Sequence, residues 1–217
     1  TSLILAMDEV DSTLGHFTSY LKDWSSRSYK EMRLKVPKIF ENTEENVVLK
    51  GDIFDSMKNI AVDFAYLDPP YGSNNEKMPP SRVRYASYYH VWATICKNDK
   101  PPVFGAALRR EDTSDRVAAT VFEEFRKDND GHFIAVKAIE KLIQNVNAKY
   151  VALSYSSGGK ATAEELNDIL NRHGKLIKTI ELDYKKNVMA DMKWTNEWLR
   201  DAEEPNREFI FLIDKQA

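Results

Sequence analysis

The sequence is poor in cysteine and glycine and has no long apolar run. Its 217 residues include eight glycines and a single cysteine, Cys96, which cannot form an internal disulfide. No stretch approaches the roughly 20 apolar residues that a membrane-spanning helix needs, and the first residues lack the basic and apolar regions of a secretion signal. We therefore expect a soluble protein of a reducing compartment, for which the cytoplasm is the best fit.

The sequence also lacks the spacings that are typical of metal sites. Neither His-x-x-x-His nor Cys-x-x-Cys occurs, and the four histidines are scattered along the chain, at His16, His90, His132 and His173. We expect no bound metal. Cys96 lies among apolar residues of a predicted helix, which favours a core thiol over a nucleophile.

Neither sign of charge is in large excess. The chain has 31 basic and 34 acidic residues and a formal net charge of −3, which argues against a surface covered in nucleic-acid-binding charge. A local basic patch lies between residues 20 and 38, with six basic and two acidic residues. The helical spacing of these residues is as consistent with a solvated helix face as with one that contacts phosphates.

Hydrophobic periodicity divides the chain at about residue 47. Residues 1–46 are predicted to be a helical segment, with a helix or a helix pair interrupted near Gly15 over 2–20, and to form a possible DNA-facing region. From residue 47 strands alternate with helices, and a helical insertion spans about 102–148. The strands are expected at 47–49, 62–67, 150–155, 176–184 and 208–213, and the helices at 85–96, 116–125, 133–145 and 163–172. This alternation predicts an α/β domain with a mostly parallel sheet.

One short motif stands above this background. Asp68-Pro69-Pro70-Tyr71 follows the predicted strand 62–67, and ligands of open α/β sheets bind at the carboxyl ends of strands. A carboxylate and a backbone carbonyl held by prolines can both accept hydrogen bonds from an aromatic amine, because proline has no N–H to compete. The tyrosine ring offers a face on which a planar base could stack. The alternative is a strand-ending turn with a buried tyrosine.

The segment from Val62 to Gly72 resembles the catalytic motif of S-adenosylmethionine-dependent adenine-N6 DNA methyltransferases of the Dam-like class. Residues 85–101 and 150–217 are similar to the later parts of that class. The resemblance implies a Rossmann-like methyltransferase sheet, mostly parallel with an antiparallel C-terminal strand. It also implies S-adenosylmethionine as methyl donor, double-stranded DNA as substrate, extrusion of the target adenine, and a place in a bacterial restriction-modification system.

The resemblance also assigns roles to residues. Asp68 and the carbonyl of Pro69, in a loop stiffened by Pro70, would accept hydrogen bonds from the adenine amine, and the ring face of Tyr71 would stack on the extruded base. The cofactor would bind at Asp52, Ile53 and Asp68, although Asp52 fits a helix cap equally well. The residues expected to contact nucleic acid, with a surface loop as the alternative, are Arg82, Arg84, Tyr85 and Tyr88.

One family feature is missing from this sequence. The glycine-rich Phe-x-Gly-x-Gly motif, which precedes the catalytic motif in this class and binds the cofactor, does not occur. The glycine-rich residues 156–160 match no nucleotide-binding pattern and are interpreted as a turn. We therefore expect a chain that is incomplete at its N-terminus or complemented by another subunit. A non-catalytic DNA-binding fragment or subunit and an RNA-directed adenine methyltransferase remain alternatives.

Overall fold

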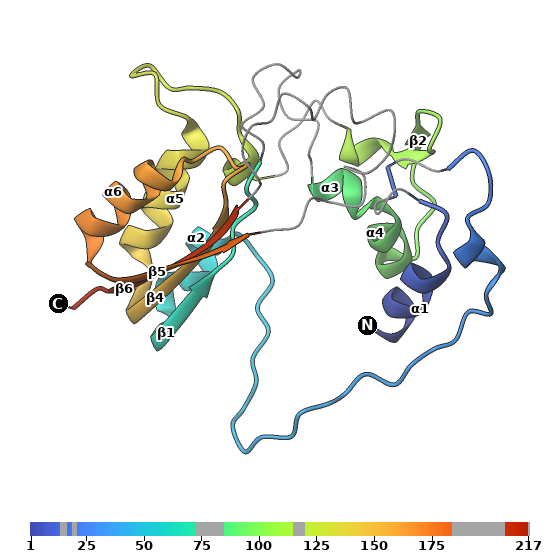
Figure 1. The fold of residues 1–217 in the computed structure, drawn as a ribbon, viewed down its shortest axis with the longest axis horizontal. Coiled ribbons are helices and arrows are strands. Elements are labelled where there is room, and N and C mark those ends of the chain that lie inside the picture. Colours follow the sequence, from blue (N-terminus) through green and yellow to red (C-terminus); the bar gives the residue numbers. More distant parts are fainter. Residues whose placement is uncertain (14–16, 19–20, 73–84, 115–119, 184–206, 217) are drawn as a thin grey trace. The chain divides into compact units, whose positions relative to one another are not determined.

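The computed structural model describes residues 1–13, 17–18, 21–72, 85–114, 120–183 and 207–216 (Figure 1). The chain divides into two compact units, which are described separately. The first comprises Thr1–Val48 and Tyr85–Ser114, and the second Leu49–Arg84 and Asp115–Ala217. The predicted functional boundary at residue 47 stays a prediction, but Tyr85–Ser114 groups with the N-terminal segment and not with the sheet.

The first unit is built from short elements. They are α1 (Ser2–Val10), η1 (Ser26–Tyr29), α3 (Tyr85–Tyr88), α4 (His90–Lys97), the hairpin strands β2 (Val103–Phe104) and β3 (Arg109–Arg110), and η3 (Glu111–Thr113). A ring nitrogen of buried His90 lies 2.7 Å from the carbonyl of Phe17, whose ring packs edge-on against Trp92 at 5.2 Å. These contacts join α4 to the segment that follows α1. Cys96 of α4 is exposed, so the expected core thiol is wrong.

A four-stranded sheet forms the centre of the second unit. Its strands are β1 (Ala61–Leu67), β4 (Asn147–Ser156), β5 (Lys175–Asp183) and β6 (Arg207–Asp214), in the order β1-β4-β6-β5. β1 and β4 are parallel, whereas β6 is antiparallel to both β4 and β5. The expected antiparallel C-terminal strand is therefore confirmed, but only one of the three described strand pairs is parallel, so the sheet is mixed and the expected mostly parallel pairing is wrong. The structure is a mixed α/β fold; the finer Rossmann-like assignment stays a prediction.

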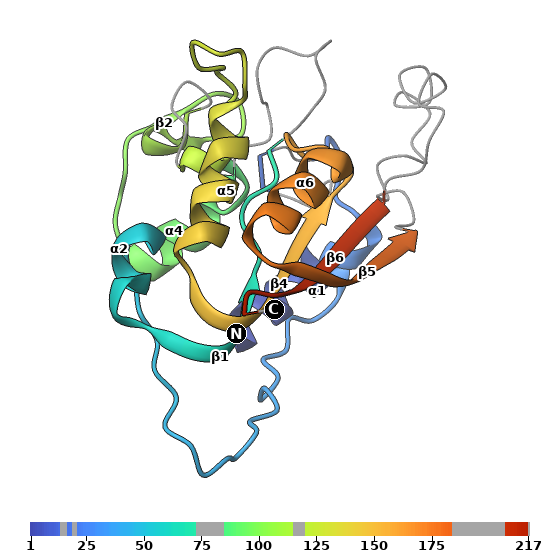
Figure 2. The same ribbon diagram turned by 90° about the vertical axis from the view of Figure 1, so that its left-hand side faces the viewer.

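Helices cover one face of this sheet. Figures 1 and 2 show α5 (Ile134–Asn145) and α6 (Ala163–His173) on the same side, where Arg172 of α6 bonds Glu140 of α5 at 2.8 Å. The core between helices and strands consists of aliphatic and aromatic side chains, among them Ile139, Ile143, Leu153, Leu166, Phe211 and Ile213. Thr162 begins α6 with a capping box to Glu165, at the start of the helix expected over 163–172.

The remaining elements of this unit are short. They are α2 (Ile53–Ser56) and η2 (Met57–Asn59), which precede β1, and η4 (Val121–Glu123), which precedes α5. No helix in the described ranges is long and apolar enough to cross a membrane.

Several predicted elements are wrong. Residues 47–49 form no strand, and Val48 is 93% exposed, because β-forming residues without a neighbouring strand gain nothing from extension. The first helix ends at Val10, where Asp11 turns to extended backbone, and the basic stretch 20–38 contains only η1 in its described part. The helix expected over 116–125 is, in its described residues, the single turn η4, capped by the Thr120 hydroxyl.

Candidate active site

The end of β1 places the Asp68–Tyr71 loop beside the end of β4. Leu67, the last residue of β1, pairs with Leu153 of β4, and both side chains are buried. Because the strands are parallel, Asp68 and Ser154 follow at the same edge of the sheet. Pro69 and Pro70 end the strand there, since neither can donate a hydrogen bond to a further ladder.

Tyr71 links the loop to the sheet through its hydroxyl group. This hydroxyl donates to Oδ1 of Asp68 at 2.8 Å and lies 3.1 Å from Oγ of Ser154. Asp68 is exposed, Tyr71 is half-buried and Ser154 is buried. Burial raises the pKa of the Tyr71 phenol above its usual value; Ser154 opposes this shift and Asp68 adds to it. The phenol therefore stays protonated as a donor.

The backbone of Tyr71 is held as well. Its carbonyl accepts hydrogen bonds from the Tyr155 hydroxyl at 3.0 Å and from the backbone N–H of Lys160 at 2.9 Å. The rings of Tyr71 and Tyr155 lie 4.9 Å apart between centroids. Gly159 packs on the buried Tyr155 ring so closely that a Cβ there would lie 2.3 Å from Cε1. Residues 156–160 therefore form a turn, as expected, and this turn also supports the Asp68–Tyr71 loop.

The loop lines a cavity of about 900 Å³ within the second unit. All three predicted cofactor residues, Asp52, Ile53 and Asp68, line it, together with Pro69 and Pro70 and, from other elements, Gly51, Tyr66, Leu67, Thr120, Val121, Phe122, Glu124, Arg126, Ile134 and Leu142. Asp52 also begins α2, where its Oδ1 accepts a hydrogen bond from the N–H of Phe54 at 2.9 Å. Both interpretations of Asp52, helix cap and cavity residue, therefore describe the same side chain.

One wall of the cavity contains a charged pair. The Glu124 carboxylate accepts from the Arg126 guanidinium at 2.7 Å, and this bond holds the pKa of Glu124 below its usual range. The rings of Phe54 and Phe122 stack at 5.9 Å between centroids beside it. The cavity thus combines carboxylates, one guanidinium and apolar walls. In the described part of the chain, no group of three or more side chains could hold a metal ion.

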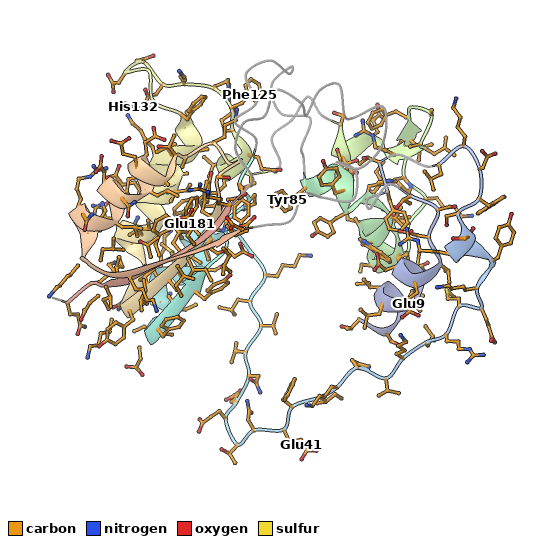
Figure 3. The ribbon with its side chains drawn as sticks, in the orientation of Figure 1. Glu9, Glu41, Tyr85, Phe125, His132 and Glu181 are labelled. Carbon is orange, nitrogen blue, oxygen red and sulfur yellow. The ribbon has the colours of Figure 1, made fainter. Side chains whose placement is uncertain are left out.

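Two of the four predicted nucleic-acid residues belong to the described structure, and both lie in the first unit. Arg82 and Arg84 lie outside the described residues. Tyr85, labelled in Figure 3, and Tyr88 belong to α3 of the first unit. The rings of Tyr85 and Tyr89 stack at 6.2 Å between centroids. Their role stays a prediction.

Sequence reasoning missed several residues of the site. Ser154 and Tyr155 contact the loop, Gly159 packs on the Tyr155 ring, and Phe122 lines the cavity. A usable signal existed for the first two, since polar residues at the end of a buried strand are expected at the carboxyl edge of the sheet. Phe122 lies in the single turn η4, and no pattern in the sequence indicated that it lines a cavity.

Comparisons with known proteins agree with the motif. The family model described as D12 class N6 adenine-specific DNA methyltransferase matches residues 1–156. The chain is 28% identical over 170 residues to the modification methylase StsI of Streptococcus sanguinis, which covers 78% of this chain and 23% of that protein. It is 27% identical over 213 residues to the type II methyltransferase M.FokI of Planomicrobium okeanokoites, covering 98% and 29%.

A third relative gives a similar result. The type II methyltransferase M.NlaIII of Neisseria lactamica is 25% identical over 186 residues, covering 85% of this chain and 49% of that protein. The chain thus spans between about a quarter and a half of the length of these relatives. No solved structure matches the chain.

Proposed function

The chain belongs to the D12 class of N6 adenine-specific DNA methyltransferases, and from this we propose that it carries the catalytic loop of a site-specific enzyme. The enzyme transfers a methyl group from S-adenosylmethionine to the N6 amine of an extruded adenine in double-stranded DNA, as the modification enzyme of a bacterial restriction-modification system. One observation carries this proposal: the Asp68–Tyr71 loop opens on a cavity that also contains Asp52 and Ile53.

The loop suits the chemistry of an aromatic amine. The N6 lone pair of adenine is delocalised into the ring, so two acceptors on the amine hydrogens favour the form in which the lone pair is available. Asp68 is exposed and can reach an extruded base, whereas buried Pro69 holds its carbonyl in a fixed backbone. The amine nitrogen would then form the new N–C bond as the sulfur–methyl bond of the donor breaks and leaves its electron pair on sulfur. The amine also loses one proton, for which the Asp68 carboxylate is the nearest acceptor in this assignment.

The cavity fits the methyl donor in size and chemistry. Its volume of about 900 Å³ lies within the range of small-molecule sites. The Asp52 carboxylate suits ribose hydroxyls, the side chains of Ile53 and Phe122 suit the adenine face, and Arg126 suits the amino-acid carboxylate. Bound S-adenosylmethionine supplies the methyl group as an electrophilic sulfonium, and a carboxylate such as Asp68 suits its positive charge.

The first unit is the proposed DNA-facing part. Its stretch 20–38 interleaves basic residues with the exposed rings of Trp24 and Tyr29, a combination that suits phosphates and bases. Three of its six cations already form ion pairs, namely Arg27 with Asp11, Arg33 with Glu31 and Lys35 with Glu9. The proposed base and phosphate contacts of Arg82, Arg84, Tyr85 and Tyr88 rest on their place directly after the catalytic loop.

We propose that a further strand pairs with the outer edge of β1. Among the described residues β1 pairs only with β4. The alternate side chains Val62, Phe64 and Tyr66 share one face of β1 and are exposed, by 53% for Phe64 and 56% for Tyr66, so the described residues leave this face uncovered as well as the edge. A segment that carries the missing glycine-rich turn, in the same polypeptide or a second subunit, would cover this edge and complete the cofactor site.

Two measurements test the proposal. Full-length protein is incubated with duplex DNA and isotope-labelled S-adenosylmethionine, and the nucleosides are separated by mass. Label in N6-methyladenine of DNA is the expected result; label in RNA only, or in no nucleoside, contradicts it. Calorimetry with this chain alone should detect weak cofactor binding or none, because the described cavity lacks the glycine-rich turn, and the contacts that remain do not offset the entropy of immobilising the ligand. If S-adenosylmethionine does not bind even when the complementing segment is present, the non-catalytic alternative is favoured.

A further inference from the structure

The hydrogen bonds around Tyr71 connect a buried residue of β4 to the exposed carboxylate of the loop. We propose that Ser154 is a positioning residue, which orients the Asp68 carboxylate through the Tyr71 hydroxyl and leaves the second oxygen of Asp68 for the adenine amine. The proposal rests on the proposed function for its catalytic consequence but not for the hydrogen-bonded link itself.

The direction of each hydrogen bond follows from the donors available. A carboxylate only accepts, so the single phenol proton of Tyr71 is committed to Oδ1 of Asp68. The Ser154 hydroxyl, 3.1 Å away, must then donate to the phenol oxygen. The result is a directed chain from Ser154 through Tyr71 to Asp68. Because each bond polarises the next, the donor from Ser154 strengthens the bond that Tyr71 gives to Asp68.

The position of Ser154 suits this role. Ser154 is 8% exposed and lies in β4 between Leu153 and Tyr155, which are both fully buried. The sheet therefore fixes the position of its hydroxyl. Successive residues of a strand point to opposite faces, and here Ser154 meets the Tyr71 hydroxyl while Tyr155 meets the Tyr71 carbonyl. Tyr71 is therefore held at its side chain and its backbone by adjacent residues of one strand.

Asp68 needs such support because it is exposed. An exposed carboxylate samples several rotamers, and in the described residues the Asp68 side chain accepts a hydrogen bond from Tyr71 at Oδ1. Fixing one oxygen sets the direction of the other. A carboxylate held in one orientation by the protein presents its second oxygen to the amine without reorganisation during the reaction.

The link is tested in this chain by a spectroscopic measurement that needs no activity. Fluorotyrosine is placed at position 71, where its lower intrinsic pKa brings the titration into the range of the folded protein, and the ¹⁹F signal is followed against pH. In Ser154→Ala the pKa of this phenol should rise, because the donor that stabilises the phenolate is lost; in Asp68→Asn it should fall, because the negative neighbour is lost. Ser154→Thr keeps the hydroxyl and should titrate like the wild type. An unchanged pKa in Ser154→Ala would overturn the link.

The catalytic consequence is tested in the full-length enzyme. Ser154→Ala should lower kcat about tenfold, because a misoriented group costs rate, whereas the KM values for DNA and cofactor stay within about twofold. Ser154→Thr should restore kcat, which a general loss of folding would not allow. Equal kcat in Ser154→Ala and wild type overturns the positioning role. If the wild type itself transfers no methyl group, the proposed function fails, while the ¹⁹F titration still decides the link.

Discussion

The phenol of Tyr71 donates a hydrogen bond to Oδ1 of Asp68, with the two oxygen atoms 2.8 Å apart. The first and last residues of the Asp68–Tyr71 motif are therefore coupled. The ring of Tyr71 also packs on Tyr155 at 4.9 Å, so one side of it already has a protein neighbour. The sequence-based interpretation used only the ring face of Tyr71; the structure gives its hydroxyl two partners.

This coupling separates two substitutions of Tyr71. Tyr71→Phe keeps the ring and loses the donor to Asp68, so we expect about tenfold slower methyl transfer with base extrusion retained. Tyr71→Ala loses both and should also impair extrusion. Fluorescence of 2-aminopurine at the target position reports extrusion, and single-turnover transfer reports chemistry. Tyr71→Phe that transfers as fast as wild type would show that the hydroxyl has no part in the reaction.

Gly159 is predicted to be required for the support beneath the loop. A Cβ at this position would lie 2.3 Å from Cε1 of Tyr155, a fully buried ring, so Gly159→Ala should lower the free energy of unfolding by about 1–3 kcal/mol. The matched control is Gly51→Ala, whose Cβ meets the Oγ of Ser56 at 3.0 Å, the end of a side chain that can rotate. Denaturant unfolding followed by circular dichroism compares the two, and equal losses would contradict this packing.

The first unit should lose stability in acid. Buried Arg110 donates to both Asp99 and Asp112, and its hydrogen bond lowers the pKa of Asp112 to about 2. A carboxylate whose pKa is lower in the folded state stabilises that state above its unfolded pKa of about 4. This stabilisation is therefore lost as the pH falls from about 4 to about 2.

Hydrogen exchange of the α4 amides measures this loss, after correction for the intrinsic pH dependence of exchange. Asp112→Asn should reduce protection at neutral pH and flatten the acid dependence. Among the described residues, the ion-pair partners of Arg110 are Asp99 and Asp112, so Glu111→Gln serves as the control. An acid dependence that is the same in wild type and Asp112→Asn would contradict the assignment.

Much of the second unit could be predicted from sequence, because its signals are local. The capped start of α6 at Thr162 and the apolar runs of β1, β4 and β6 each define an element by themselves. The strand expected at 47–49 failed because a strand is stable only with a neighbour, which no local pattern supplies. The grouping of Tyr85–Ser114 with the N-terminal segment depends on packing between distant residues such as His90 and Phe17.

The site was predictable only at its motif. Asp68-Pro69-Pro70-Tyr71 marks a strand end, and Asp52 lies in a recognisable helix start. The contacts that hold the motif join residues more than 80 positions apart, such as Tyr71 with Ser154 and Tyr155. They follow from the parallel pairing of β1 with β4, which fixes the two strand ends at one edge.

The most direct test of the account is single-turnover methyl transfer by Asp68→Asn in the full-length protein. Wild type and variant are compared on one duplex, with the N6-methyladenine formed as the readout and DNA affinity measured in parallel. Because Asp68 is exposed, the fold and DNA affinity should be retained. The rate should fall about 10²–10³-fold, the usual effect of losing one preorganised polar group. A variant that keeps more than about a tenth of the wild-type rate would contradict a catalytic Asp68.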